Sequence, residues 1–326
     1  MQQPVIDKLM SQYDGPVPGA SVLVVRDGVA IVRRGYGLAN VEDNIPATPA
    51  TNYRLASVTK QFTAAAILLL AEDERLGLDD RVRTWLPSLP AAADAVTIRH
   101  LLTHTSGLID YEEVMSETTT VQLRDADVLR LLESHDRTYF FAGSGYRYSN
   151  SGYALLALIV ERVSRRSFPA FLRENIFLPL AMHDTLVYVQ HGPTIFNRAY
   201  GYSETDGNWL RTDQGPTSAV LGDGGIYSSI DDLAKWDAAL YQDNFLSDAS
   251  RQLAFAASTP TDDAHVAYGF GWRITGETLW HSGETIGFRN VIVRYPQQRL
   301  TMVILTNRNA AEPYRMAREV ARLFLD

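Results

Sequence analysis

The first forty residues have the hydrophobic and polar pattern of a strand pair. Apolar runs at residues 22–25 and 29–32 flank the dipeptide formed by Asp27 and Gly28. An Asp-Gly pair suits the positive φ angles of a tight hairpin turn. The pattern therefore predicts a β-hairpin close to the start of the chain.

A long apolar segment follows, and it has the length of a helix. The pattern from residue 58 to about residue 75 is helical and strongly apolar, with an unbroken apolar run at residues 64–71, and Gly77 comes just after. Glycine can adopt the left-handed conformation that ends a helix. Because a helix that is apolar on all sides lies inside a protein, we expect a central helix here that ends near Gly77.

The middle of the chain predicts helices and loops, and the end of the chain predicts strands. Helical patterns occupy residues 98–102, capped by Thr97, and residues 126–134, 151–163 and 231–240; strand patterns occupy residues 266–274, 278–281, 288–295 and 300–306, before a last helix at 311–324. Strands at both ends with helices between them indicate a single sheet completed by the two termini.

These elements predict an α/β fold of the α+β kind. We expect one antiparallel sheet built from both termini, flanked by helices, with an inserted and mostly helical lobe. Residues 1–326 then form a single catalytic unit. Its α/β lobe covers approximately residues 1–60 and 220–326, its helical lobe covers residues 61–219, and a site between the lobes is expected.

Composition excludes several kinds of site and partner. The chain has no cysteine, so thiol nucleophiles, thiolate metal sites and iron–sulfur clusters are absent. A net charge of −8 without clustered basic residues argues against nucleic acid as a partner. The longest apolar run, residues 64–71, is too short to span a membrane, and residues 1–10 lack the apolar run of a signal peptide. We expect a soluble protein, either a mature periplasmic or secreted form or a cytoplasmic one.

Ser57 and Lys60 form the sharpest chemical feature of the sequence. Residues three apart on a helix share a face, so the lysine amine can reach the serine hydroxyl. A serine attacks well only when a neighbour takes its proton, and burial at the head of an apolar helix disfavours the charged ammonium form of a lysine. The spacing therefore predicts a nucleophile and its base.

The use of basic residues supports this interpretation. Of the 30 basic residues only Lys8, Lys60 and Lys235 are lysines, so 27 are arginines. Arginine stays protonated in proteins and cannot act as a base. Almost every basic residue of this chain is an arginine, but position 60 has a lysine, which can lose its proton. This choice supports a role for Lys60 as a base. The alternative is an exposed lysine in the first turn of a helix.

Two further segments predict the remaining parts of a site. Tyr148 and Asn150 precede an apolar helix, where Tyr148 is expected to shuttle protons and Asn150 to hold Lys60 or a substrate carbonyl. The alternative for this segment is a simple helix cap. Near the end of the chain the substrate-binding candidates are His281, Ser282, Gly283 and Glu284, in which the glycine lets a substrate lie along the strand and the Glu284 N–H joins that of Ser57 in an oxyanion hole.

The three motifs together resemble those of the serine β-lactamase and D-alanyl-D-alanine peptidase superfamily, which has Ser-x-x-Lys, Tyr-x-Asn and Lys/His-Thr/Ser-Gly in this order. Residues 101–108 and 222–236 are also similar to segments of its peptidase and esterase branches. The branch with histidine in the third motif is the nearest, and class C β-lactamases, which typically have lysine where this chain has His281, are less similar.

The resemblance implies a serine hydrolase that works through an acyl-enzyme without a metal or other cofactor. The favoured activity is that of a D-alanyl-D-alanine carboxypeptidase or D-aminopeptidase that β-lactams also acylate. A carboxylesterase, a weak β-lactamase and a penicillin-binding sensor remain alternatives. The expected partners are small-molecule or peptide substrates, and the oligomeric state and natural substrate stay open.

A few further residues are candidates for metal or substrate binding. His100 and His104 have a spacing that can chelate zinc, but no glutamate follows His100 as a zincin requires, and His104 is expected to form hydrogen bonds within its turn. The G-x-S-x-G motif of α/β-hydrolases is absent. Arg273 and Arg289 are the candidates for binding a substrate carboxylate. Tyr268 is either sheet core or part of the cleft wall.

Overall fold

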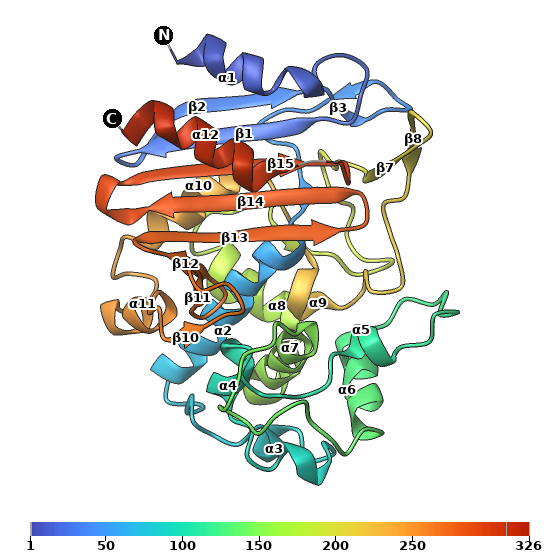
Figure 1. Cartoon of the computed structure of the whole chain (residues 1–326), viewed down its shortest axis with the longest axis vertical. Coiled ribbons are helices and arrows are strands. Elements are labelled where there is room, and N and C mark those ends of the chain that lie inside the picture. Colours follow the sequence, from blue (N-terminus) through green and yellow to red (C-terminus); the bar gives the residue numbers. More distant parts are fainter. Residues whose placement is uncertain (1, 311, 326) are drawn as a thin grey trace.

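The computed structural model describes residues 2–310 and 312–325, and its largest element is an antiparallel sheet in the order β10-β11-β12-β13-β14-β15-β1-β2. The start of the chain supplies β1 (Ala20–Arg26) and β2 (Val29–Tyr36); its end supplies β10 (Thr259–Pro260), β11 (Ala267–Tyr268), β12 (Arg273–Thr275), β13 (Thr278–Thr285), β14 (Phe288–Tyr295) and β15 (Leu300–Thr306). The two parts join where β1 pairs with β15 (Figure 1). The predicted fold class is confirmed.

Helices are the main regular elements of the chain between the two parts of the sheet. They are α2 (Lys60–Glu72), α3 (Val82–Trp85), α4 (Ile98–Leu102), α5 (Tyr111–Val114), α6 (Asp125–Glu133), α7 (Asn150–Ser164), α8 (Phe168–Leu172), α9 (Leu221–Gly224), α10 (Ile230–Ala239) and α11 (Asp248–Ala254), and a short 3-10 helix, η2 (Ala56–Thr59), leads directly into α2. Within the described residues, no helix combines the length and the hydropathy that are needed to cross a bilayer.

Short strands lie among these helices and outside the main sheet. One small sheet joins β5 (Tyr53–Arg54), β9 (Ile226–Ser228) and β6 (Leu186–Val187), and two hairpins pair β3 (Leu38–Asn40) with β4 (Ile45–Pro46) and β7 (Tyr202–Thr205) with β8 (Asn208–Arg211). The pairing of β5 with β9 matters for the site, because β5 precedes η2 and β9 follows α9. It brings these two segments together.

The main sheet buries apolar side chains on both faces. Because successive side chains of a strand point to opposite faces, Val22 and Val24 of β1 lie in one core and Leu23 and Val25 in another. The first core is covered by α1 (Gln3–Leu9) and α12 (Pro313–Leu325); in Figure 1, α12 crosses the front of the sheet and α1 lies beside β2 at the top. The second core contains the central helices, so the sheet lies between two helical layers.

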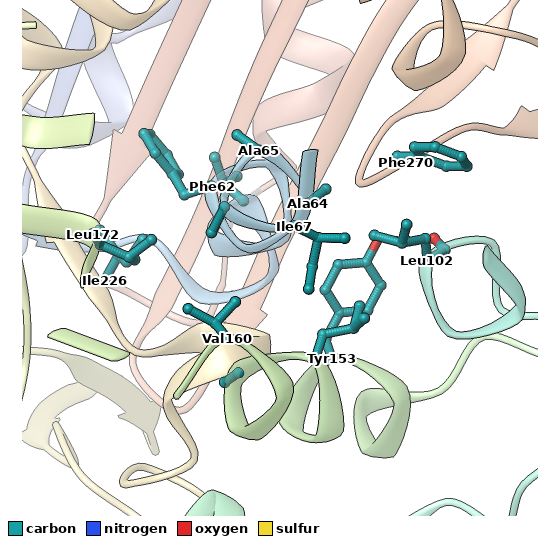
Figure 2. Close-up of a cluster of buried hydrophobic side chains, with 14 of the residues drawn as sticks. Phe62, Ala64, Ala65, Ile67, Leu102, Tyr153, Val160, Leu172, Ile226 and Phe270 are labelled. Atoms are coloured by element: carbon teal, nitrogen blue, oxygen red, sulfur yellow. The ribbon is translucent and has the colours of Figure 1, made fainter. Parts of the chain in front are cut away.

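Helix α2 is the centre of the second core. Residues 60–68 are all buried, and Figure 2 shows Phe62 and Ile67 in one cluster with Tyr153 and Val160 of α7. Full burial of such a side chain contributes about 1.5–3 kcal/mol. The predicted central helix is therefore confirmed, and its packing fixes where its first residue lies.

The end of this helix differs from the prediction. Helix α2 ends at Glu72, and the residue in the left-handed conformation is Glu74, with φ 55°, rather than Gly77. The buried stripe stops at Leu70, and residues 72–75 are exposed and polar. Since a helix inside a core is held mainly by its packing, it ends where that packing ends.

The strands near the third motif also differ from the prediction. Strand β13 continues to Thr285, because β14 pairs with it along its whole length, from Leu279 opposite Arg294 to Thr285 opposite Phe288. His281 to Gly283 therefore lie inside a strand and not at its end. The predicted strand at residues 266–274 is divided into β11 and β12, since Gly271 turns the chain with φ 77°.

A buried ion pair connects the sheet to α10. The Nε atom of Arg294 donates to Oδ1 of Asp237 at 2.6 Å, and the two side chains are only 1% and 3% exposed. The hydroxyl of Thr301 donates to the same carboxylate oxygen at 2.8 Å. Both charges are thus desolvated and depend on each other.

We predict that Asp237→Ala lowers the free energy of unfolding by about 3–5 kcal/mol, because it leaves the Arg294 charge buried without a partner. The matched control is Glu319→Ala, which removes a partner of the exposed side chain of Arg315 and is expected to cost less than about 1 kcal/mol. Urea unfolding followed by circular dichroism measures both changes. Equal effects would show that the Asp237 pair does not hold α10 to the sheet.

Candidate active site

Ser57 and Lys60 lie where η2 passes into α2. The Nζ atom of Lys60 is 2.9 Å from Oγ of Ser57; the lysine side chain is completely buried and the serine is partly exposed. Ala56, directly before the serine, has the left-handed φ of 50°, which costs an alanine roughly 1 kcal/mol. The surrounding packing holds this strained turn, so the position of the Ser57 hydroxyl is set by the fold.

The amine of Lys60 has three acceptors from separate parts of the chain. Besides Ser57, it donates to Oδ1 of Asn150 at 2.8 Å and to the backbone oxygen of Asp223 at 3.0 Å. None of these three acceptors is a carboxylate. The amine is therefore solvated by neutral groups, which can also accommodate its uncharged form.

The geometry determines where the lone pair of a neutral Lys60 amine lies. The amide oxygen of Asn150 and the backbone oxygen of Asp223 can only accept hydrogen bonds, whereas a serine hydroxyl can also donate. A neutral amine with two protons therefore donates to those two oxygens and accepts from Ser57. This is the arrangement that a base needs in order to take the proton of the hydroxyl.

Asn150 is held in place by two acidic residues that the sequence analysis did not identify. Its backbone N–H donates to Oδ2 of Asp110 at 2.6 Å, and its side-chain nitrogen donates to Oε1 of Glu112 at 2.9 Å. With the nitrogen engaged by Glu112, the amide oxygen is directed at Lys60. Neither contact has a local signal in the sequence, because about 40 residues separate the partners.

Asp223 is a second functional neighbour that the sequence analysis did not identify. Its side chain accepts a hydrogen bond from the Tyr111 hydroxyl at 3.1 Å. Burial raises the pKa of Asp223 to about 8, so its carboxyl group is mostly neutral at pH 7. It therefore adds little negative charge beside Lys60.

Strand β13 and η2 approach each other closely. A Cβ atom on Gly283 would lie 2.0 Å from the backbone oxygen of Leu55, so only glycine fits there. The approach brings Ser57, Asn150, Glu112 and Glu284 to the walls of one pocket. The two residues predicted to supply the oxyanion hole, Ser57 and Glu284, thus line the same space.

Tyr148 lies near the amine of Lys60. The Nζ atom of Lys60 is 5.0 Å from the centre of the Tyr148 ring, and the ring is partly exposed. The imidazole rings of His104 and His281 lie 4.3 and 6.2 Å from the same ring, centre to centre. The structure therefore brings together the three residues predicted to be catalytic, and their roles remain predictions.

His281 is buried, and its hydrogen bonds stay within the protein. Its Nδ1 is 2.6 Å from the backbone oxygen of Ser282, and its Nε2 is 3.0 Å from the hydroxyl of Tyr268. Burial lowers the pKa of His281 well below its usual range, so the ring is neutral. Binding of a substrate by this ring remains a prediction. The two hydrogen bonds argue against a direct contact with a substrate anion, because both ring nitrogens already have partners.

The side chain of Ser282 lies on the other side of the strand. It lines a separate pocket with Trp280 and Tyr314 on the side of the sheet that α12 covers, and Glu284 borders both pockets. Alternation along β13 explains this placement, because His281 and Gly283 face the central helices and Ser282 faces the side of α12. Substrate binding by the Ser282 side chain stays a prediction.

The two arginines proposed for a carboxylate differ in their surroundings. Arg289 pairs with Glu284 at 3.5 Å and donates to the backbone oxygens of Thr285 and Phe288. The guanidinium of Arg273 lies over the rings of Tyr148 and Trp280, at 5.3 and 5.5 Å from their centres. Among the described residues its buried Nε has no hydrogen-bond partner and no carboxylate forms an ion pair with it. Of the two arginines, Arg273 is therefore the one without a carboxylate partner.

His100 and His104 both act on backbone groups. Nδ1 of His100 accepts from the N–H of Thr97 at 3.2 Å, completing the cap of α4, and Nδ1 of His104 accepts from the N–H of Ser149 at 3.1 Å. In the part of the chain that the structure describes, no three acidic or histidine side chains form a group that could hold a metal ion. His104 was expected to form hydrogen bonds within its own turn; this prediction is wrong, because the partner of its ring is Ser149, 45 residues further along the chain.

Comparisons with known proteins give a consistent result. A family model described as Beta-lactamase matches residues 5–326. Penicillin-binding protein 4* of Bacillus subtilis is 35% identical over 318 residues, which cover 91% of this chain and 70% of that protein. Among solved structures, the octameric penicillin-binding protein homologue from Pyrococcus abyssi has a TM-score of 0.88 and 27% identity, covering 99% of this chain and 76% of that one. EstCE1, a hydrolase with promiscuous acyltransferase activity, has a TM-score of 0.83 and 25% identity over 98% of both chains.

We predict that Lys60→Arg lowers kcat for p-nitrophenyl acetate about 10²- to 10⁴-fold, because an arginine keeps its proton and cannot act as the base. The matched control is Lys235→Arg, at a partly exposed lysine of α10 that pairs with Asp232 and has no contact with the described site residues, which is expected to leave kcat unchanged. Steady-state kinetics at pH 7 measure both. An arginine variant as active as the unaltered protein would refute the role of Lys60 as a base.

Proposed function

The chain belongs to the β-lactamase family and is a serine hydrolase, and from this premise we propose that it cleaves amides of D-amino acids as a D-alanyl-D-alanine carboxypeptidase or D-aminopeptidase does. The acyl-enzyme forms on Ser57. The observation that carries the choice of substrate is Arg273, an unpaired guanidinium next to Tyr148. A peptide that ends in a free carboxylate would supply its missing partner.

The first half of the reaction forms the acyl-enzyme. Oγ of Ser57 attacks the amide carbon while its proton passes to Nζ of Lys60, and the backbone N–H groups of Ser57 and Glu284 stabilise the oxyanion. Tyr148 then donates its proton to the leaving nitrogen and is reprotonated from Lys60. The bond between the carbonyl carbon and that nitrogen breaks, and the amine departs.

The second half of the reaction returns the free enzyme. A water molecule attacks the ester carbon of Ser57, and its proton passes to Tyr148 while Tyr148 gives its own proton to Lys60. The bond to Oγ breaks, the serine regains a proton from Lys60, and the acid leaves. Asn150 keeps the amine of Lys60 in place in both halves, which is why its fixation by Asp110 and Glu112 supports the proposal.

The leaving group lies on the Tyr148 side of the site in this mechanism. A carboxylate attached to the leaving amine would then lie close to Arg273, whose charge no protein carboxylate among the described residues balances. The proposed division into an α/β lobe and a helical lobe fits this geometry. Arg273 and Glu284 belong to the first, and Tyr148 and Asn150 belong to the second.

A carboxylesterase is the second candidate. It is favoured by the similarity to EstCE1, which extends over 98% of both chains. The alcohol that a simple ester releases carries no carboxylate. An esterase would therefore make no use of Arg273. The two candidates therefore differ in whether the free carboxylate of the leaving group affects the rate.

We predict that fluorescent penicillin labels Ser57, because its strained amide presents the same carbonyl chemistry as the proposed substrate. Peptide mass spectrometry locates the label, and Ser57→Ala is expected to lose it. A stable adduct supports a peptidase or a penicillin-binding sensor, and rapid loss indicates a β-lactamase. Labelling that persists in Ser57→Ala would contradict the assignment of the nucleophile.

We predict that the enzyme prefers acetyl-D-alanyl-D-alanine to its C-terminal amide, which lacks the carboxylate, and that Arg273→Gln removes this preference. An ionic hydrogen bond of about 1.5–3 kcal/mol corresponds to a loss of roughly 10- to 100-fold in kcat/KM for the acid, with the amide unchanged.

The matched variant is Arg289→Gln, which is expected to keep the ratio of the two substrates, since Arg289 already has partners. Amine release measured for both substrates gives that ratio. Equal rates on the acid and the amide by the unaltered enzyme would remove the case for a carboxypeptidase and favour the esterase.

A further inference from the structure

His104 holds the chain on both sides of Tyr148. The backbone N–H of Arg147 donates to the backbone oxygen of His104 at 3.0 Å, and the backbone N–H of Ser149 donates to Nδ1 of its ring at 3.1 Å. The same ring lies against the Tyr148 ring, with centres 4.3 Å apart. Three contacts of one residue thus fix the three-residue segment that contains Tyr148.

The backbone of His104 is itself in an uncommon conformation. Its φ is 59°, in the left-handed region that costs an ordinary residue roughly 1–2 kcal/mol, and the residue is only 1% exposed. Glycine adopts this conformation without strain, and asparagine, aspartate and histidine adopt it more often than other residues do. The turn therefore tolerates a histidine, and the contacts of the side chain are what distinguish it from a glycine at this position.

The hydrogen bond from Ser149 requires one form of the His104 ring. Because Nδ1 accepts, the proton of the neutral ring is on Nε2. Burial, followed by the charges of Lys60, His281 and Arg273, lowers the pKa of His104 well below its usual range. The ring is therefore neutral at pH 7, and Nδ1 stays available as an acceptor.

The other neighbours of the Tyr148 ring are more distant or are cations. The ring of Tyr268 is 6.2 Å away, centre to centre, and Lys60 and Arg273 place their charges 5.0 and 5.3 Å from the centre of the Tyr148 ring. His104 is the nearest ring contact and also the one that holds the backbone. It is thus the residue best placed to set the direction of the phenol.

We propose that His104 is a positioning residue for Tyr148, which directs the phenol at the leaving group beside Lys60. This inference rests on the proposed function, in which Tyr148 is the proton donor. Displacement of a reacting group by about 1 Å can cost roughly 100-fold in rate. Loss of His104 therefore acts on the same step as loss of the Tyr148 hydroxyl.

The test is a double-mutant cycle with D-alanine p-nitroanilide as substrate. His104→Gly removes the ring, and glycine adopts the left-handed φ without strain. His104→Asn also tolerates this φ and keeps an acceptor in the place of Nδ1. We expect kcat to fall about 10- to 100-fold in the glycine variant, with KM within about 2-fold, and His104→Asn to recover part of the loss. In the Tyr148→Phe background, His104→Gly is expected to cause no further loss.

Two results would overturn the inference. A loss in kcat of equal size in the presence and absence of the Tyr148 hydroxyl would show a general effect on structure, and an asparagine variant no better than the glycine variant would exclude the hydrogen bond from Ser149. If the glycine variant does not fold, the asparagine variant, which also lacks the ring, replaces it in the cycle, with a smaller loss in kcat that is again expected to vanish in the Tyr148→Phe background. A Tyr148→Phe variant as active as the unaltered enzyme would instead contradict the proposed mechanism, and the inference with it.

Discussion

A buried amine must find an acceptor for each of its protons, and at Lys60 three parts of the chain meet to supply them. The 3-10 helix η2 provides Ser57, α7 provides Asn150 and α9 provides the backbone of Asp223. Glycines make this meeting possible, because a Cβ atom on Gly222 would lie 2.2 Å from a backbone oxygen of α7, and one on Gly271 would lie 2.7 Å from the backbone oxygen of Lys60. The apolar core around α2 fixes the lysine, and the glycines let its partners come close.

Local pattern was sufficient to predict the elements whose hydrogen bonds and packing are regular. The bounds of β14 and β15 and the Thr97 cap of α4 agree with the prediction, because strand alternation and a capping residue act over a few positions. The extension of β13 to Thr285 could not be predicted, because it depends on pairing with β14. The predicted end of α2 at Gly77 was wrong for a similar reason, because tertiary packing decides where the helix stops.

The same distinction applies to the site. Ser57 and Lys60 are three residues apart, so a helix rule connects them, and the motif that contains Tyr148 and Asn150 directly precedes a helix. His104, Glu112 and Asp223 act on these residues from distant parts of the sequence, and only the folded chain shows the contacts. Charge balance also required the structure, because Arg273 and Arg289 look alike in sequence and differ only in having a carboxylate partner.

That charge balance explains why the site favours negative charge that arrives or develops during the reaction. Lys60 and Arg273 have no ion pair with a carboxylate among the described residues, and burial keeps His281 neutral and Asp223 mostly so at pH 7. Glu112 reaches Lys60 only through the amide of Asn150. A cation without a carboxylate partner stabilises an oxyanion or a substrate carboxylate, because that anion does not have to displace an existing partner. In the proposed mechanism Lys60 becomes a cation only when it takes the proton of Ser57, so its charge and that of Arg273 both act on the anionic group that forms or binds beside them.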